Sequence, residues 1–133
     1  MLQFGKRRRA GAIMSLAVLC CTAAWSQTAQ AEGDATAGKK RYQMTCLGCH
    51  GDDRMAPTTG PSLVNIIGRK AGSAASGVIS RAAAESGIVW DEQNLDQFLA
   101  SPSEKIHGTI MPIGVRNPKE RADLIAYLST LKK

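Results

Sequence analysis

The chain has 133 residues, enough for one domain, and a formal net charge of +6. Four of its 17 basic residues lie among the first nine positions, and the other 13 nearly balance the 11 acidic residues, leaving a charge of +2. This balance excludes a strongly basic nucleic-acid-binding protein. Aromatic residues make up only 5% of the chain, so we expect the core to need apolar surface from a bound group.

The amino-terminal segment has the pattern of a secretory signal peptide. A positive stretch, Lys6–Arg9, precedes an apolar run over residues 10–24, and residues 29–31 (Ala-Gln-Ala) are typical of a cleavage site. We therefore predict a signal peptide over residues 1–31, a domain over residues 32–133 and a periplasmic location. Retention as a membrane anchor is the alternative, but the apolar run is shorter than a typical spanning helix.

The mature chain is expected to begin with a helix that Asp34 caps and that runs to about Cys46. Residues 46–50 then read Cys-Leu-Gly-Cys-His, the pattern of a c-type haem attachment site. Two thiols at this spacing can each bond one vinyl group of a porphyrin, and the imidazole that follows can bind the iron. Cys46, Cys49 and His50 therefore predict one covalently bound haem c, with His50 as an iron ligand.

Two other readings of these cysteines are weaker. A thioredoxin-like redox pair requires a βαβ setting, and no such pattern occurs in the chain. A zinc site requires four ligands, which only Cys46, Cys49, His50 and His107 could supply. Because two of these four are consecutive residues, they fit a tetrahedral structural site poorly.

The rest of the chain predicts short helices separated by long loops. From His50 to Ile79 it is rich in Gly, Pro, Ser, Thr and Ala without a sustained period, which is typical of loops. A short helix is predicted over Ser80–Ser86, and a second from the cap Asp91 to Pro102. Residues 103–115 are expected to be irregular, and a terminal helix should follow Asn117. We predict an all-α fold wrapped around a flat ligand.

Five further stretches follow one another in a distinctive order and spacing. They are residues 60–63 (Gly-Pro-Ser-Leu), 67–72 (Ile-Gly-Arg-Lys-Ala-Gly), 87–90 (Gly-Ile-Val-Trp), 108–111 (Gly-Thr-Ile-Met) and 120–128 (Glu-Arg-Ala-Asp-Leu-Ile-Ala-Tyr-Leu). With the attachment motif, they make residues 33–133 similar to class I cytochrome c of the mitochondrial and alpha-proteobacterial type. The resemblance implies the small all-α fold of that family, with several helices and long loops around one haem.

The sixth iron ligand is expected to be a methionine, and the mature chain offers three. Met44 lies on the attachment helix, and Met55 follows His50 too closely to pass easily around the porphyrin. Met111 lies far along the chain in a predicted loop between two helices and matches the ligand methionine of the family. The rival is His107, which would give a bis-histidine iron of lower potential.

The resemblance also implies roles around the haem. Pro61 matches the residue whose carbonyl accepts the His50 ring N–H, and Arg69 and Trp90 match residues that bind a buried haem propionate. The chain departs from the family where Phe98 replaces a common tyrosine, and where Ser80 and Ala84 replace polar pocket residues.

Ligation by histidine and methionine fills both axial positions, so we expect an electron carrier and not an enzyme. The expected partners are redox proteins, namely a periplasmic dehydrogenase, or a membrane oxidase or reductase, and the carrier is expected to be a monomer. The alternative is a haem subunit held in a dehydrogenase complex; a peroxidase or ligand sensor would need an open iron site. Lysines that surround the haem edge in mitochondrial relatives are replaced here by Ser103, Glu104 and Ile110, so electrostatic steering should be weak.

Overall fold

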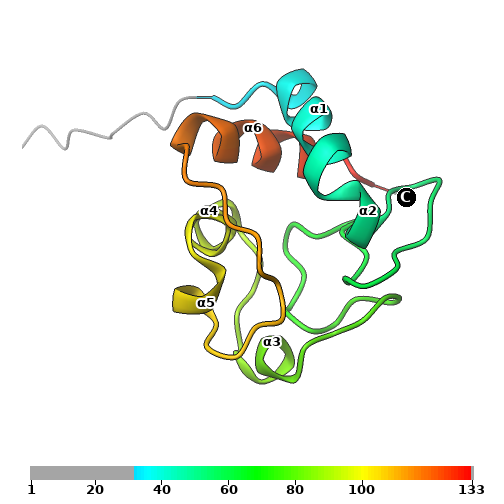
Figure 1. Ribbon diagram of the computed structural model, residues 1–133, viewed down its shortest axis with the longest axis vertical. Coiled ribbons are helices and arrows are strands. Elements are labelled where there is room, and N and C mark those ends of the chain that lie inside the picture. The colour runs from blue at the N-terminus through cyan, green and yellow to red at the C-terminus, as the bar shows by residue number, and fades with distance from the viewer. Residues whose placement is uncertain (1–31, 133) are drawn as a thin grey trace, which may run out of the picture.

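The computed structural model describes residues 32–132 and is helical (Figure 1). Within these residues the helices are α1 (Ala35–Thr45), α2 (Leu47–His50), α3 (Arg81–Glu85), α4 (Glu92–Ala100), α5 (Pro102–Lys105) and α6 (Pro118–Leu128). Extended pairing in the described part of the chain is limited to two isolated bridges. The predicted all-α class is therefore confirmed. The predicted signal peptide lies outside the described residues.

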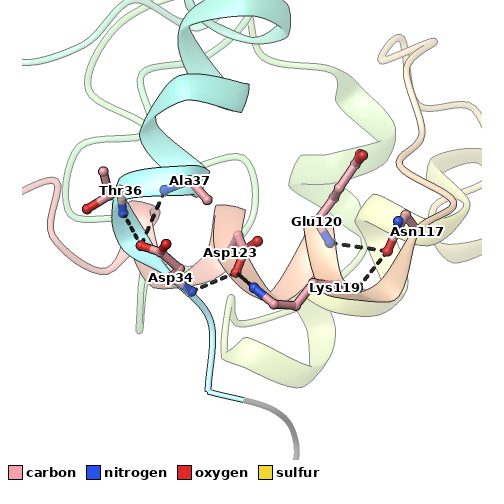
Figure 2. Close-up of polar contacts among 7 residues, drawn as sticks. All are labelled: Asp34, Thr36, Ala37, Asn117, Lys119, Glu120 and Asp123. Carbon is pink, nitrogen blue, oxygen red and sulfur yellow. Dashed lines mark hydrogen bonds and ion pairs between the residues drawn. The ribbon is translucent and has the colours of Figure 1, made fainter.

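The predicted starts of the first and last helices are confirmed. The Asp34 carboxylate accepts hydrogen bonds from the backbone N–H groups of Thr36, at 2.8 Å, and Ala37, at 3.3 Å (Figure 2). At α6 the Asn117 side chain accepts in the same way from two N–H groups of the first turn, and Pro118 occupies the first helical position. Each such cap stabilises its helix by about 1 kcal/mol.

Helix α1 crosses α6 at the top of Figure 1, and a glycine makes the close approach possible. A Cβ built on Gly38 would lie only 1.9 Å from the carbonyl oxygen of Asp123. One turn further along, the rings of Tyr42 and Tyr127 pack at a centroid distance of 5.2 Å. Gly38 and Tyr42 of α1 therefore both contact α6, and the part of α6 nearest to Gly38 is the backbone of Asp123.

A buried carboxylate joins the start of α1 to α6. Asp123 Oδ1 accepts from the Asp34 backbone N–H at 2.6 Å and from Lys119 Nζ at 2.5 Å (Figure 2). The Lys119 ammonium and the Asp34 N–H together hold the pKa of the Asp123 carboxyl below its usual range. The start of the described chain is thereby attached to its last helix.

The middle helices follow the predictions with one difference. Ser80 caps α3 and Asp91 caps α4, as expected. The segment after α4 was predicted to be irregular, but α5 begins directly at Pro102. The reason is that Ser101, with φ −151° and ψ 90°, leaves the helical conformation, while the fixed φ of Pro102 suits the first position of a new turn.

The long loops enclose one side of the molecule. Helices α1, α4 and α6 supply much of the buried core, including Leu95, Leu99, Leu124 and Leu128. In Figure 1 residues 51–80 run from the right side to the bottom of the molecule, and residues 106–117 rise from the bottom to the start of α6, largely without regular structure. Among residues 32–132 no helix is both long and apolar enough to cross a membrane.

Candidate haem-binding site

A cavity of about 470 Å³ lies between the core helices and the long loops. This volume falls in the ordinary range of cofactor sites. The cavity wall is mainly apolar. All seven residues predicted to hold the cofactor line it, namely Cys46, Cys49, His50, Pro61, Arg69, Trp90 and Met111. The fold therefore brings residues as far apart in the chain as Cys46 and Met111 to one site.

The two thiols lie on the cavity wall where α1 gives way to α2. Cys46 ends α1 with its N–H donating to the Tyr42 carbonyl at 2.8 Å, and Cys49 follows within α2. Burial raises the pKa of the Cys46 thiol, whereas a thioredoxin-type nucleophile needs a lowered one. With no βαβ unit in residues 32–132 either, the redox-pair alternative is not supported.

His50 is held by a hydrogen bond to the backbone. Its Nδ1 lies 2.8 Å from the Pro61 carbonyl oxygen, as the resemblance to class I cytochrome c implies. An Nδ1–H that donates to this carbonyl leaves the Nε2 lone pair free for a metal. Burial lowers the pKa of the His50 imidazole, and the hydrogen bond to Pro61 opposes this effect only partly. The ring is therefore kept in the neutral form that binds a metal.

Gly60 is a site residue that the sequence reasoning missed. A Cβ at this position would lie 2.7 Å from both Nδ1 and Cε1 of His50, so any larger residue would push the ring aside. The Gly60 N–H also donates to the Cys49 carbonyl at 3.1 Å, which attaches this loop to the attachment helix. The signal that could have revealed it is a glycine directly before the residue whose carbonyl holds the histidine.

Met111 is the only methionine within residues 32–132 that lines the cavity. Met44 is 80% exposed and Met55 is 45% exposed, and neither borders the cavity. His107, the rival ligand, is exposed and is also absent from the cavity wall.

Arg69 reaches the cavity but uses its terminal nitrogens elsewhere. Nη1 donates to the Val64 carbonyl at 2.8 Å and Nη2 donates to the Ser62 carbonyl at 2.6 Å. Its Nε is buried and has no hydrogen-bond partner in the described part of the chain. Because a buried donor without a partner is costly, this nitrogen is suited to a carboxylate supplied by a ligand. Trp90 lies buried on the same wall and packs on Phe98 with ring centroids 5.1 Å apart.

The structure places the two family departures, Ser80 and Ala84, at and beside α3. The Ser80 hydroxyl already accepts from the Ala83 N–H at 3.0 Å as the cap of α3. Ala84 lies against Gly72, where a Cβ on the glycine would be 2.3 Å from its Cα. Ala84 therefore packs against the backbone of Gly72, and of the two departures only Ser80 lines the cavity.

These observations fit haem c. The wall supplies two thiols, a neutral imidazole, a thioether and a buried cationic donor around an apolar cavity. By contrast, residues 32–132 contain no group of three or more His, Cys, Asp or Glu side chains placed to hold a metal ion. The zinc alternative is therefore not supported.

Known proteins resemble this chain over almost all of the described residues. The family model for cytochrome c matches residues 35–132. Cytochrome c2 from Rhodomicrobium vannielii is 38% identical over 119 residues, covering 88% of this chain and 94% of the relative. Cytochrome c type-1 from Ascaris suum is 43% identical over 98 residues, covering 73% of this chain and 88% of the relative. Among solved structures, cytochrome cH from Methylobacterium extorquens is 42% identical with a TM-score of 0.67, covering 74% of this chain and 99% of that one.

Proposed function

Because this chain belongs to the cytochrome c family, we propose that it is a periplasmic single-haem carrier whose iron is bound by His50 and Met111. Membership makes the protein an electron carrier and not an enzyme, with one haem c attached through Cys46 and Cys49. The predicted family and cofactor are thereby confirmed. The periplasmic location is supported by the signal-like pattern of residues 1–31.

The observation that carries the proposed ligation is that Met111 and His50 both line the same cavity. Its loop is anchored on both sides. Ile106 is buried and its N–H donates to the Pro102 carbonyl at 2.9 Å, while the Val115 N–H donates to the Leu99 carbonyl at 2.7 Å. A methionine between two fixed points can hold its thioether in place with little rearrangement.

Bound haem c supplies an iron that changes between Fe(II) and Fe(III) by one electron. The protein would supply two ligands to that iron and a mainly apolar cavity around the haem. His50 supplies a neutral imidazole oriented by the Pro61 carbonyl, and Met111 supplies a neutral, soft thioether that favours Fe(II). With both positions filled by side chains, no place is left for a substrate, which suits a carrier.

Carbon monoxide tests this function directly. Ferrous haem binds carbon monoxide only where an axial position is open or opens easily. We therefore expect the absorption spectrum of the reduced holo-protein at neutral pH to be unchanged by carbon monoxide. A rapid, complete shift of the spectrum would indicate an open iron site and contradict the proposed carrier in favour of a ligand-binding haem protein.

The partner surface proposed for this carrier is an apolar rim at the mouth of the cavity. It consists of Val78, Ile79, Ile110 and Ile113, which line the cavity and are 50%, 37%, 59% and 40% exposed. Exposed aliphatic side chains gathered at one site mark an interaction surface. We infer that redox partners dock through this apolar rim.

Charge around the rim is scarce. Residues 71–80 and 106–115 contain no Asp, Glu, Lys or Arg. The nearby Arg81 is paired with Glu85 at 2.7 Å. Lys105 donates to the amide oxygens of Asn94 at 2.7 Å and Gln97 at 2.6 Å, which draws its ammonium toward α4. A partner therefore meets a nearly neutral surface.

Electron transfer to the physiological partner should depend only weakly on salt. Without a ring of lysines, we expect the second-order rate constant to change less than about threefold between low and physiological ionic strength. Ile110→Ser should lower the rate by removing apolar contact area, while Met44→Ser, which changes an exposed side chain outside the cavity, should not. Stopped-flow measurement gives all three values. A steep fall of the wild-type rate with salt would refute the neutral docking surface.

A further inference from the structure

A single peptide group connects the proposed iron ligand to the loop opposite it. The carbonyl of Pro61 faces His50 Nδ1 at 2.8 Å. The N–H of the same peptide group, on Ser62, donates to the Ser76 carbonyl at 3.0 Å. The orientation of the Pro61–Ser62 peptide plane therefore sets the strength of the hydrogen bond to His50, since hydrogen bonds weaken as their angle departs from linear.

The next carbonyl along the chain is held by a cation. Arg69 Nη2 donates to Ser62 O at 2.6 Å, and Nη1 donates to Val64 O at 2.8 Å. Such charge-assisted bonds are roughly twice as strong as neutral ones, and two of them from a rigid planar group also fix direction. The guanidinium thus clamps the segment that carries the Pro61 carbonyl.

The other side of this segment is supported without any charge. Pro61 forms an antiparallel bridge with Gly77. A Cβ on Gly77 would lie 2.1 Å from the Gly60 carbonyl oxygen and 2.8 Å from the Pro61 Cα. Gly77 also has φ +90°, a conformation that favours glycine. Residues 60–62 therefore lie between the Arg69 clamp and the loop that contains Gly77.

The geometry points to Arg69 as a positioning residue for His50, acting through the Ser62 carbonyl on the orientation of the Pro61 carbonyl. This role is separate from propionate binding, because each terminal nitrogen donates one N–H to a carbonyl of the loop, whereas Nε has no partner in the described residues and can donate to a carboxylate. The inference rests on the proposed axial role of His50. Its consequence is that Arg69 stabilises Fe(III) by keeping the imidazole basic, whereas its positive charge alone would favour Fe(II).

The test is the solvent exchange of the His50 Nδ1 proton, followed by NMR on the reduced holo-protein with labelled histidine. In Arg69→Gln the shorter side chain cannot reach both carbonyls. We expect the proton to exchange about tenfold faster, the factor that corresponds to losing one charged hydrogen bond. Lys70→Gln is the matched control: it removes the same charge from the next residue, which is exposed, and should leave the exchange rate unchanged.

Two further variants keep the inference falsifiable if Arg69→Gln does not mature. Arg69→Lys keeps the charge but offers a single ammonium for two carbonyls, so exchange should stay faster than in the wild type. Gly77→Ala disturbs the segment without changing the charge and should both speed exchange and raise the reduction potential.

The outcomes separate this inference from the proposed ligation. In the Arg69→Gln protein, the His50 Nδ1 proton could exchange at the wild-type rate while only the reduction potential changes. That result would show that Arg69 acts on the haem carboxylate alone and would overturn its positioning role. Failure of the ligation itself would appear in the wild type, as a His50 ring without the large chemical shifts that haem imposes on an axial ligand.

Discussion

The Met111→Ala protein should lose the sulfur-to-iron charge-transfer band of its ferric state and have a substantially lower reduction potential. The reason is that the thioether is a neutral, soft ligand that favours Fe(II), and alanine leaves its place to water or another side chain. Axial ligands set haem potentials over a range of about 0.8 V, so this change should be among the largest that one substitution can cause here. Absorption spectroscopy and electrochemistry of the holo-protein measure both effects.

The other methionines are the controls for this experiment. Met55→Ala and Met44→Ala remove exposed side chains that do not border the cavity, so the band and the potential should stay near their wild-type values. His107→Ala should also leave the neutral-pH spectrum unchanged, because its side chain is exposed and lies off the cavity wall. If Met55→Ala removed the band while Met111→Ala kept it, the assignment of the sixth ligand would be wrong.

The Gly38→Ala protein should be destabilised by about 3 kcal/mol or more, which is at or above the upper end of ordinary overpacking. The added Cβ would lie 1.9 Å from the Asp123 carbonyl oxygen and 3.0 Å from the Tyr127 Cβ. Because the obstacle is backbone, α1 must move away from α6, and the hydrogen bond from Asp34 to Asp123 is strained with it. Denaturant unfolding of the holo-protein gives the change in the free energy of unfolding.

Gly48→Ala is the matched control, since the two glycines both lie within helices. A Cβ on Gly48 has nothing within 4 Å, so helix propensity alone should set the change in the free energy of unfolding. Alanine should therefore be neutral or stabilising by up to about 1 kcal/mol. Propensity alone would predict the same gain at Gly38. Equal effects at the two positions would show that the crossing of α1 and α6 does not depend on the missing side chain.

The helix starts could be predicted from the sequence because each depends on a few neighbouring residues. Asp34, Ser80, Asp91 and Asn117 each place an oxygen before the free N–H groups of a first turn, and each is found as the N-cap. The same local reasoning was wrong after α4. From the sequence Pro102 is predicted to end helical structure, whereas it begins a new turn once Ser101 has left the helix.

The attachment motif could also be predicted, because its chemistry requires two thiols and an imidazole at fixed spacing in one short stretch. The hydrogen-bond partners of Arg69 could not be predicted, because the carbonyls of Ser62 and Val64 become its acceptors only after the loop has folded back. Gly60 was missed for the same reason. Its importance comes from the His50 ring, ten residues away in the chain and in contact only through the tertiary structure.

By itself the sequence determined the fold class, the starts of α1, α3, α4 and α6, and the haem attachment residues, because caps, helical spacing and the Cys-x-x-Cys-His pattern act over a few residues. Only the tertiary structure decided which methionine lines the same cavity as His50, which exposed aliphatic residues form one rim, and which side chains hold the segment with the Pro61 carbonyl. These features depend on how residues 51–80 and 106–117 pack against α1, α4 and α6. Such packing joins segments far apart in the chain, and no local pattern specifies it.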